Sequence, residues 1–118
     1  MADVLLISGL FSLFFKTVVK IASAFGPFLL ALISGSGDAA TVAFNESVTP
    51  HAVEFGLNTI NMGSMAALGG TLGRTISPIA GATIICAGIA GVDPMEVCKR
   101  NALGIVLALI VGMVLLVF

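Results

Sequence analysis

The fold is decided by a run of small and polar residues in an otherwise apolar chain, Ser34-Gly35-Ser36-Gly37-Asp38-Ala39-Ala40-Thr41. The residues before it, 21–33, carry no charge. A second interruption follows at 69–78, and each interruption contains one ionisable side chain, Asp38 or Arg74. Irregular backbone inside a membrane is tolerated only where protein buries it or where it lines a watery cavity. The two interruptions therefore predict a solute site near the middle of the bilayer, of the kind that broken helices form in secondary transporters.

The composition indicates an all-α integral membrane protein. Of the 118 residues 58% are hydrophobic and only 9% are charged, against roughly 25% charged residues in globular domains. A net charge of −1 without a basic cluster argues against a nucleic-acid partner. Cys86 and Cys98 lack the spacing of a metal or redox site, and we expect Cys86 to pack as a small apolar residue. No nucleotide-binding loop or catalytic motif is present, so we expect no enzyme, no cofactor and no metal site.

The apolar segments divide the chain into five parts. We expect an N-terminal helix at 1–20, a re-entrant hairpin at 21–55, a broken helix at 56–90, a loop at 91–100 and a terminal span at 101–118. Each limb of the hairpin is too short to cross a hydrocarbon core of about 30 Å. The hairpin would therefore dip into the membrane and return to the side from which it came.

The loop before the last span has a helix start and a basic pair. Asp93 suits the N-cap and Pro94 the first helical position. The basic residues 99–100 place this loop in the cytoplasm by the positive-inside rule. The same rule conflicts with Lys16 and Lys20, which this arrangement puts outside. These two lysines share a helix face, and they either snorkel to the interface or draw an anionic solute to the mouth of the hairpin.

The helical part at 56–73 is rich in small residues. Gly63, Ala67 and Gly70 would allow close approach to a neighbouring helix. Met62 and Met65 are expected to pack rather than to bind a metal.

The tip of the predicted hairpin combines glycines with hydroxyl groups. Glycine lets backbone groups approach a ligand closely, and serine or threonine hydroxyls can donate to a carboxylate or help to coordinate a cation. We expect Ser36, Gly37 and Thr41 to bind substrate. Ser34 and Gly35 are expected to help hold a coupling cation or proton.

Asp38 and Arg74 are the ionisable residues of the two interruptions. Asp38 would repel a carboxylate, so it either holds the coupling cation or proton, pairs with Arg74, or caps the returning limb. Arg74 presents a planar fork that suits a carboxylate, or else it is a structural residue that pairs with Asp38 or with helix carbonyls. Thr75 and Ser77 repeat the hydroxyl pattern of the tip and join Arg74 as candidate substrate-binding residues.

Two stretches of the chain resemble a known family. Ser-Gly-Ser-Gly-Asp-Ala-Ala-Thr-Val-Ala-Phe at 34–44 and Leu-Gly-Arg-Thr-Ile-Ser-Pro at 72–78 resemble the C-terminal part of the anaerobic four-carbon dicarboxylate carriers of the DcuC type, which belong to a wider ion transporter superfamily. The resemblance runs from about residue 21 to the end. It implies one half of an inverted-repeat, elevator-type transporter, in which each half supplies a hairpin and a broken helix. The matching residues are Ser36, Gly37, Asp38 and Thr41 at the tip, and Arg74, Thr75, Ser77 and Pro78 at the break.

The function implied by the resemblance is secondary transport of succinate, fumarate and malate across the bacterial inner membrane, by a multi-pass protein. Many superfamily relatives carry an Asn-Thr pair at the hairpin tip where this chain has Gly37-Asp38, which leaves proton coupling or exchange open. The expected partners are the dicarboxylate substrate, the lipid bilayer, a missing N-terminal half of the carrier, and a second copy in a homodimer when complete.

A different class of function needs only one of the two interruptions. In this alternative the chain is a small oligomeric membrane subunit or a proton-conducting protein, with Asp38 as its buried acid.

Overall fold

The computed structural model describes residues 2–54 and 56–117, and this part of the chain is all-helical. Positions 1, 55 and 118, which fall at the ends of expected segments, lie outside the described residues. In chain order the elements are α1 (Ala2–Ser34), α2 (Gly37–Ser47), the short 3-10 helix η1 (Thr49–Ala52), α3 (Thr59–Thr75), α4 (Gly81–Ala90) and α5 (Pro94–Val117). The helical class expected from the sequence is confirmed.

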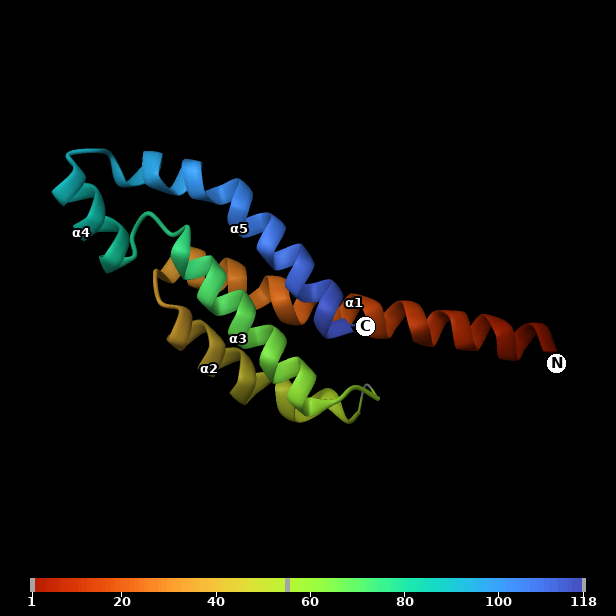
Figure 1. Ribbon diagram of the computed structural model, residues 1–118. Helices are drawn as coiled ribbons and strands as arrows, with labels where there is room; N and C mark the ends of the chain where they lie inside the picture. Colours follow the sequence, from red (N-terminus) through yellow and green to blue (C-terminus); the bar gives the residue numbers. More distant parts are fainter. Residues whose placement is uncertain (1, 55, 118) are drawn as a thin grey trace.

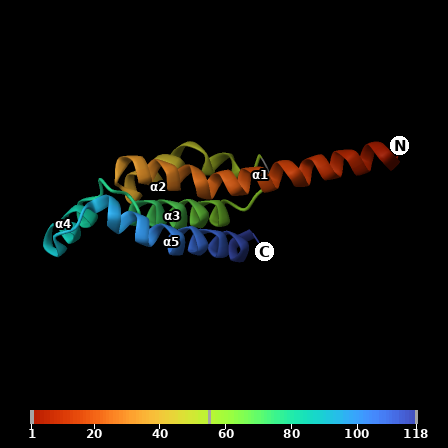
Figure 2. The ribbon, with the colours of Figure 1, turned by 90° about the horizontal axis from the view of Figure 1, so that it is seen from above.

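The helices form an elongated bundle around α3 (Figure 1). α3 packs against α1, α2 and α5, whereas α4 lies beyond the end of α3 and contacts α5. The first half of α1 extends past the other helices, so that the N-terminus lies far from the bundle and the C-terminus lies near the middle of α1 (Figure 2). The molecule measures 66 × 26 × 19 Å.

α1 joins two segments that the sequence analysis separated. It runs without interruption over 33 residues, so the expected boundary at residue 20 is not a helix end. Lys16 and Lys20 fall at that boundary, and lysine is a good helix former, so a charge alone does not end the helix. At 1.5 Å per residue α1 is about 50 Å long.

α1 and α2 form an antiparallel hairpin with a short turn (Figure 1). Only Gly35 and Ser36 are non-helical, although the polar run in the sequence is longer. Gly35 has φ 74°, a left-handed conformation that glycine adopts readily. The hydroxyl oxygen of Ser36 accepts a hydrogen bond from the Ala39 amide at 3.3 Å. The N-cap of α2 is therefore Ser36 and not Asp38.

Three glycines bring α3 into backbone contact with the hairpin. Gly69, Gly70 and Gly73 are all buried. A β-carbon added to Gly69 or Gly73 would collide with carbonyl oxygens of α1, those of Ala24 and Phe28. On Gly70 it would lie 2.7 Å from the carbonyl oxygen of residue 37 in α2. No side chain larger than hydrogen fits at these positions without moving a helix.

The packed face of α3 is turned slightly from the expected one. Gly70 is in the contact, as predicted, but Ala67 is exposed and Gly63 is only half-buried. Met62 and Met65 are each only 1% exposed, which confirms their packing role. The main apolar cluster joins α1, α3 and α5 through Ala24, Phe28, Met65, Ile76 and Leu109.

Large apolar side chains cover the outside of the bundle. Ala2–Ser34 and Pro94–Leu116 are long and apolar enough to cross a membrane, and their most apolar windows are 0% and 6% buried. In α1 the exposed fractions of Leu5 and Phe11 are 73% and 69%. Leaving a large apolar side chain in water forgoes roughly 1.5–3 kcal/mol, so this surface fits lipid or further protein.

The turn between α4 and α5 follows the expected signals. α4 ends at Ala90 and is capped by Gly91, whose φ is 68°. The Asp93 carboxylate accepts a hydrogen bond from the Met95 amide at 3.0 Å. This confirms Asp93 as the N-cap and Pro94 as the first residue of α5. The expected loop at 91–100 is correspondingly shorter, because the helix begins directly after its cap.

We predict that Gly69→Ala lowers the thermal unfolding midpoint of the protein in detergent. Overpacking of a close contact costs about 1–3 kcal/mol, and here the obstacle is the backbone of α1. Gly88→Ala is the matched control, because nothing lies within 4 Å of a β-carbon at that position. It should be neutral or stabilising by up to about 1 kcal/mol through helix propensity. Equal midpoints for the two variants would contradict the contact.

Candidate functional site

The hairpin tip lies against the break between α3 and α4. α3 ends at Thr75 and α4 begins at Gly81, so the break is shorter than the polar run in the sequence. A β-carbon on Gly35 would lie 3.1 Å from the carbonyl oxygen of Ile79 in the break. The two polar interruptions therefore meet in space.

Ser77 fastens the break to the hairpin. Its side chain is fully buried, and its hydroxyl donates to the carbonyl oxygen of Leu32 at 2.7 Å. That carbonyl belongs to the C-terminal end of α1, where carbonyl groups lack partners within the helix. Ser77 was expected to bind substrate. In the structure its hydroxyl instead donates a hydrogen bond to a carbonyl at the C-terminal end of α1.

Thr41 and Gly37 form part of the contact between α2 and α3. The Thr41 hydroxyl lies 2.8 Å from the carbonyl oxygen of Gly37 and 3.4 Å from that of Ala66 in α3. A β-carbon on Gly37 would lie only 2.6 Å from the carbonyl oxygen of Gly70. These two candidate substrate residues are closely packed in the structure.

Asp38 and Arg74 do not form the ion pair that the sequence left open; the described residues contain no salt bridge between them. Both side chains are exposed. Asp38 lies in the first turn of α2 and Arg74 in the last turn of α3. A helix favours negative charge at its N-terminus and positive charge at its C-terminus, so each residue suits its own helix end.

The remaining tip residues shape the turn. The Ser34 hydroxyl oxygen accepts from the Ser36 amide at 3.2 Å, and Gly35 supplies the left-handed turn position. Together with the exposed Asp38, they form a short polar surface at the end of the hairpin.

A pocket of about 350 Å³ opens beside Arg74. It lies between the end of α3, the start of α4 and the first turns of α5, and its lining residues are Thr71, Arg74, Thr75, Ala80, Ala82, Thr83, Cys86, Val97 and Asn101. Pockets for small molecules measure roughly 300–1,000 Å³. Of the predicted site residues, Arg74 and Thr75 line this pocket, and those of the hairpin tip do not.

The N-terminus of α4 opens into this pocket without a cap. Among the described residues no side chain caps it, and its N-cap position is occupied by Ala80. The first amide groups of a helix have no partner within the helix, and Ala82 and Thr83 of this turn line the pocket. A free helix N-terminus attracts anions, and the Arg74 guanidinium can bind a carboxylate in bidentate fashion. The pocket is therefore suited to a small anion.

The sequence did not predict four lining residues with polar or thiol side chains: Thr71, Thr83, Cys86 and Asn101. They lie inside regular helices, and Thr71 falls within the polar run at 69–78 although α3 continues through it. The i, i+4 spacing of Thr71 and Thr75 was an available signal. Cys86 is exposed, in contrast to the expected packing role, whereas Cys98 is buried.

The pocket is not at the middle of α5. Val97 and Asn101, which line it, belong to the first two turns of that helix. The pocket therefore lies at the end of the molecule where α4 joins α5, near the turn at 91–93.

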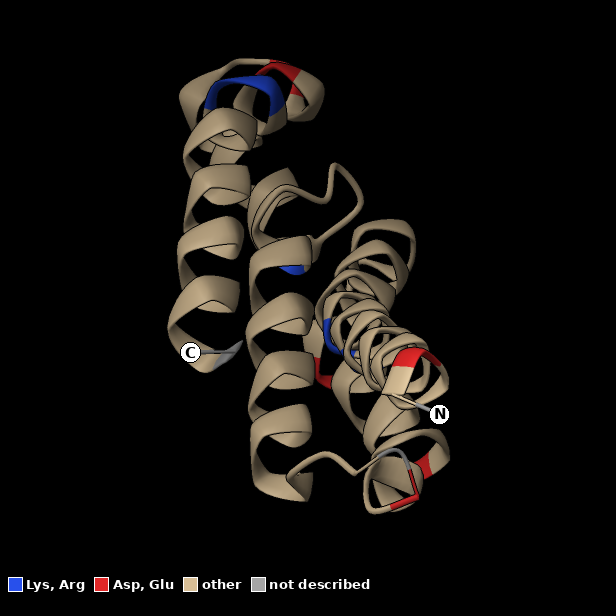
Figure 3. Ribbon diagram, turned by 90° about the vertical axis from the view of Figure 1, so that its right-hand side faces the viewer, with Lys and Arg blue, Asp and Glu red and all other residues tan. Residues whose placement is uncertain are grey.

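Charged residues of both signs gather at the end of the molecule where α4 joins α5 (Figure 3). There Glu96 and Arg100 form an ion pair of 2.8 Å between exposed side chains. Exposed pairs of this kind contribute about 0–1 kcal/mol. This end is a solvated surface, distinct from the pocket.

Comparison with known proteins decides the family. The family described as "DcuC: C4-dicarboxylate anaerobic carrier" matches residues 4–118. This chain belongs to the DcuC family. The resemblance stated from the two sequence stretches is thereby confirmed, and the family is one of carriers, not enzymes. Membership of a carrier family also places this DcuC-family chain in a membrane.

Two relatives show how much of a longer protein is matched. The anaerobic C4-dicarboxylate transporter DcuC of Escherichia coli K12 is 30% identical over 86% of this chain and 25% of its own length. A Haemophilus influenzae protein described as an uncharacterized transporter is 56% identical over 78% of this chain and 33% of its own length. The chain thus spans a third or less of these relatives. No solved structure matches it.

We predict that Ser77→Ala destabilises the fold by about 1–3 kcal/mol, because it leaves the partly buried Leu32 carbonyl without its donor. Ser12→Ala, on the exposed and projecting part of α1, is the matched control and should be neutral. Thermal unfolding of both variants in detergent measures the difference. A wild-type midpoint for Ser77→Ala would show that the hydroxyl does not hold the break to the hairpin.

Proposed function

We propose that this DcuC-family chain forms part of a secondary carrier for four-carbon dicarboxylates, with the pocket beside Arg74 as one portion of its substrate site. The observation that carries the proposal is the meeting of an uncapped helix N-terminus and an arginine in one pocket. Both features favour a carboxylate. The names of the E. coli relative and of the family point to the same chemical class.

Succinate, fumarate and malate each carry two carboxylates. We propose that this chain directly binds one of the two carboxylates of its substrate. Arg74 and Thr75 would contact that carboxylate together with the amides at the start of α4. Asn101, across the pocket on α5, can donate to a second oxygen. We assign Ser36, Gly37, Thr41 and Ser77 to the packing that holds tip and break together.

The proposed architecture is one half of an inverted-repeat transporter in the bacterial inner membrane, in a multi-pass arrangement. α2, α3 and α4 have 11, 17 and 10 residues, fewer than the ~20 that a full crossing needs. A hairpin of α1 and α2 that enters and leaves on one side, and a crossing made of α3 and α4 in series, would accommodate these lengths. The unwound segments would then line the substrate site.

We propose that the second half of the site comes from an N-terminal half of the carrier, because the relatives are three to four times as long as the matched region. An inverted repeat places its substrate between two tips and two broken helices, and this chain offers one of each. A homodimer of the complete carrier is proposed as well.

Whether transport proceeds by exchange or is coupled to protons or another cation, the coupling would involve the hairpin tip. Ser34, Gly35 and Asp38 form its polar surface, and Asp38 is free of ion pairs within the described part of the chain. The alternative of a proton-conducting subunit required Asp38 to be a buried acid. Asp38 is exposed in this chain, so that alternative would need further copies of the chain to cover it.

We predict that Arg74→Gln lowers succinate exchange at least tenfold without changing membrane insertion. A hydrogen bond to a charged group contributes about 1.5–3 kcal/mol, which corresponds to factors of ten or more. The assay is counterflow of labelled succinate in proteoliposomes that hold this chain with a matching N-terminal half. Arg100→Gln is the control, since its side chain lies on the solvated surface, and it should retain exchange within twofold.

A thiol reagent provides a second measurement of the same site. Succinate should slow the labelling of Cys86, which lines the pocket, while the buried Cys98 stays unlabelled. Normal exchange by Arg74→Gln together with unprotected Cys86 would remove this pocket from the transport path.

We predict that single cysteines at positions 20 and 56, in a chain without its native cysteines, label from the same side of the membrane. A cysteine at position 92, in the turn between α4 and α5, should label from the opposite side and serves as the control. The reason is that a re-entrant hairpin adds no crossing between 20 and 56. Labelling of positions 20 and 56 from opposite sides would replace the hairpin by an ordinary span.

A further inference from the structure

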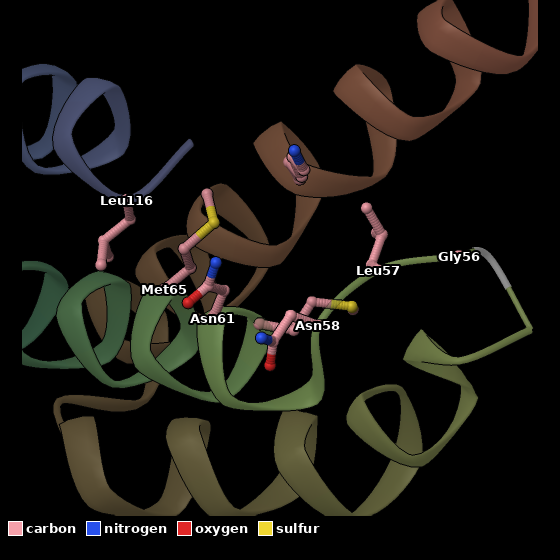
Figure 4. Close-up of a pocket in the computed structure, with 8 residues that line it drawn as sticks. Gly56, Leu57, Asn58, Asn61, Met65 and Leu116 are labelled. Atoms are coloured by element: carbon pink, nitrogen blue, oxygen red, sulfur yellow. The ribbon is translucent and has the colours of Figure 1, made fainter. Parts of the chain in front are cut away.

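A second pocket lies at the other end of α3, far from the break (Figure 4). Its volume is about 130 Å³, and a water occupies about 30 Å³ in the liquid, so it admits only a small group. The walls come from α1, the segment before α3, the first turns of α3 and the end of α5. Its lining residues are Lys20, Gly56, Leu57, Asn58, Asn61, Met62, Met65 and Leu116.

Two lysines give this end of the bundle a positive charge. Lys20 lines the pocket, and the ammonium nitrogen of Lys16 lies 3.2 Å from where a β-carbon on Gly56 would be. Within residues 2–54 and 56–117 neither lysine has an ion pair. Glu54, an acidic residue close by in the chain, contacts His51 at 3.3 Å.

The start of α3 adds hydrogen-bond donors to the positively charged lysines. Asn58 caps the helix, because its side-chain oxygen accepts from the Ile60 amide at 2.9 Å. Its amide nitrogen is therefore free to donate, and Asn61 lies one turn further along α3 (Figure 4). A lysine and two side-chain amide groups that line one pocket match the oxygens of an anion.

The rest of the pocket is apolar, and this favours an anion that also has an apolar part. Leu57, Met65 and Leu116 form its other walls (Figure 4). On α1 the apolar residues between Lys20 and the hairpin tip include Ile21 and Leu29, which are exposed at 42% and 51%. A ligand that suits both surfaces has an anionic head and an apolar tail.

The pocket also lies where lipid headgroups would be. The solvated charges at 96–100 mark one membrane surface, and from Asn101 to Leu116 α5 rises about 24 Å, most of a hydrocarbon core of about 30 Å. The end of α5 that lines this pocket is thus near the other membrane surface. A lysine at a membrane surface attracts anionic lipid headgroups.

We propose that the pocket formed by Lys20, Asn58 and Asn61, with Lys16 beside it, binds the phosphate headgroup of an anionic membrane phospholipid. The lipid's acyl chains lie along the exposed apolar face of α1. This ligand fastens the open end of the hairpin to α3 and α5, opposite the end where the break and the tip meet.

The test uses the purified chain in a neutral detergent with phosphatidylglycerol or phosphatidylcholine added. Phosphatidylglycerol should be retained and should raise the thermal midpoint, whereas phosphatidylcholine should do neither. Lys20→Gln should weaken the retention of phosphatidylglycerol about fivefold, because each basic residue near anionic lipid strengthens binding by about that factor. The double variant Lys16→Gln, Lys20→Gln should weaken it further. Lys20→Arg should keep retention. Lys99→Gln, at the opposite end of α5, is the matched charge control.

Further measurements distinguish a lipid headgroup from a free anion in solution. Inorganic phosphate and succinate at millimolar concentration should neither displace phosphatidylglycerol nor reproduce its stabilisation. Asn61→Leu keeps a similar side-chain volume and removes the donor, so it should also weaken retention. Equal retention in Lys20→Gln and Lys99→Gln would overturn the site, and stabilisation by succinate alone would turn it into a solute entry site instead.

Discussion

Contact between backbones, rather than burial of large side chains, holds this chain together. Lipid removes the hydrophobic force between helices, so their association depends on close packing of small residues. Gly69 and Gly73 lie against carbonyl oxygens of α1, and Gly70 lies against Gly37 of α2. Only at this separation can Ser77 reach the last carbonyls of α1. The position of the break against the tip, and with it the pocket, follows from these glycines.

The break itself produces the charge pattern of the site. Pro78 has no amide hydrogen and cannot continue a helix, and Ala80 offers no capping group to the helix that begins after it. α4 therefore begins with free amides in a cavity, beside the exposed Arg74. By contrast, the start of α2 is capped by Ser36. Of the two helix N-termini created by the interruptions, that of α2 is capped and that of α4 is not, so the start of α4 is the one that can bind an anion.

The sequence predicted the features that local chemistry controls. The two interruptions, the Asp93 cap and the buried methionines were readable because turns, caps and apolar periodicity are local signals. The continuity of α1 across Lys16 and Lys20 and the identity of the packed glycines were not readable in this way, because they depend on neighbours distant in the chain. The same holds for the pocket: Thr83 and Asn101 acquire a shared role only when α4 and α5 fold together. Asp38 and Arg74 suit the ends of their own helices, so polarity in an apolar chain marked the two interruptions but did not show that both side chains are exposed and unpaired in the described part of the chain.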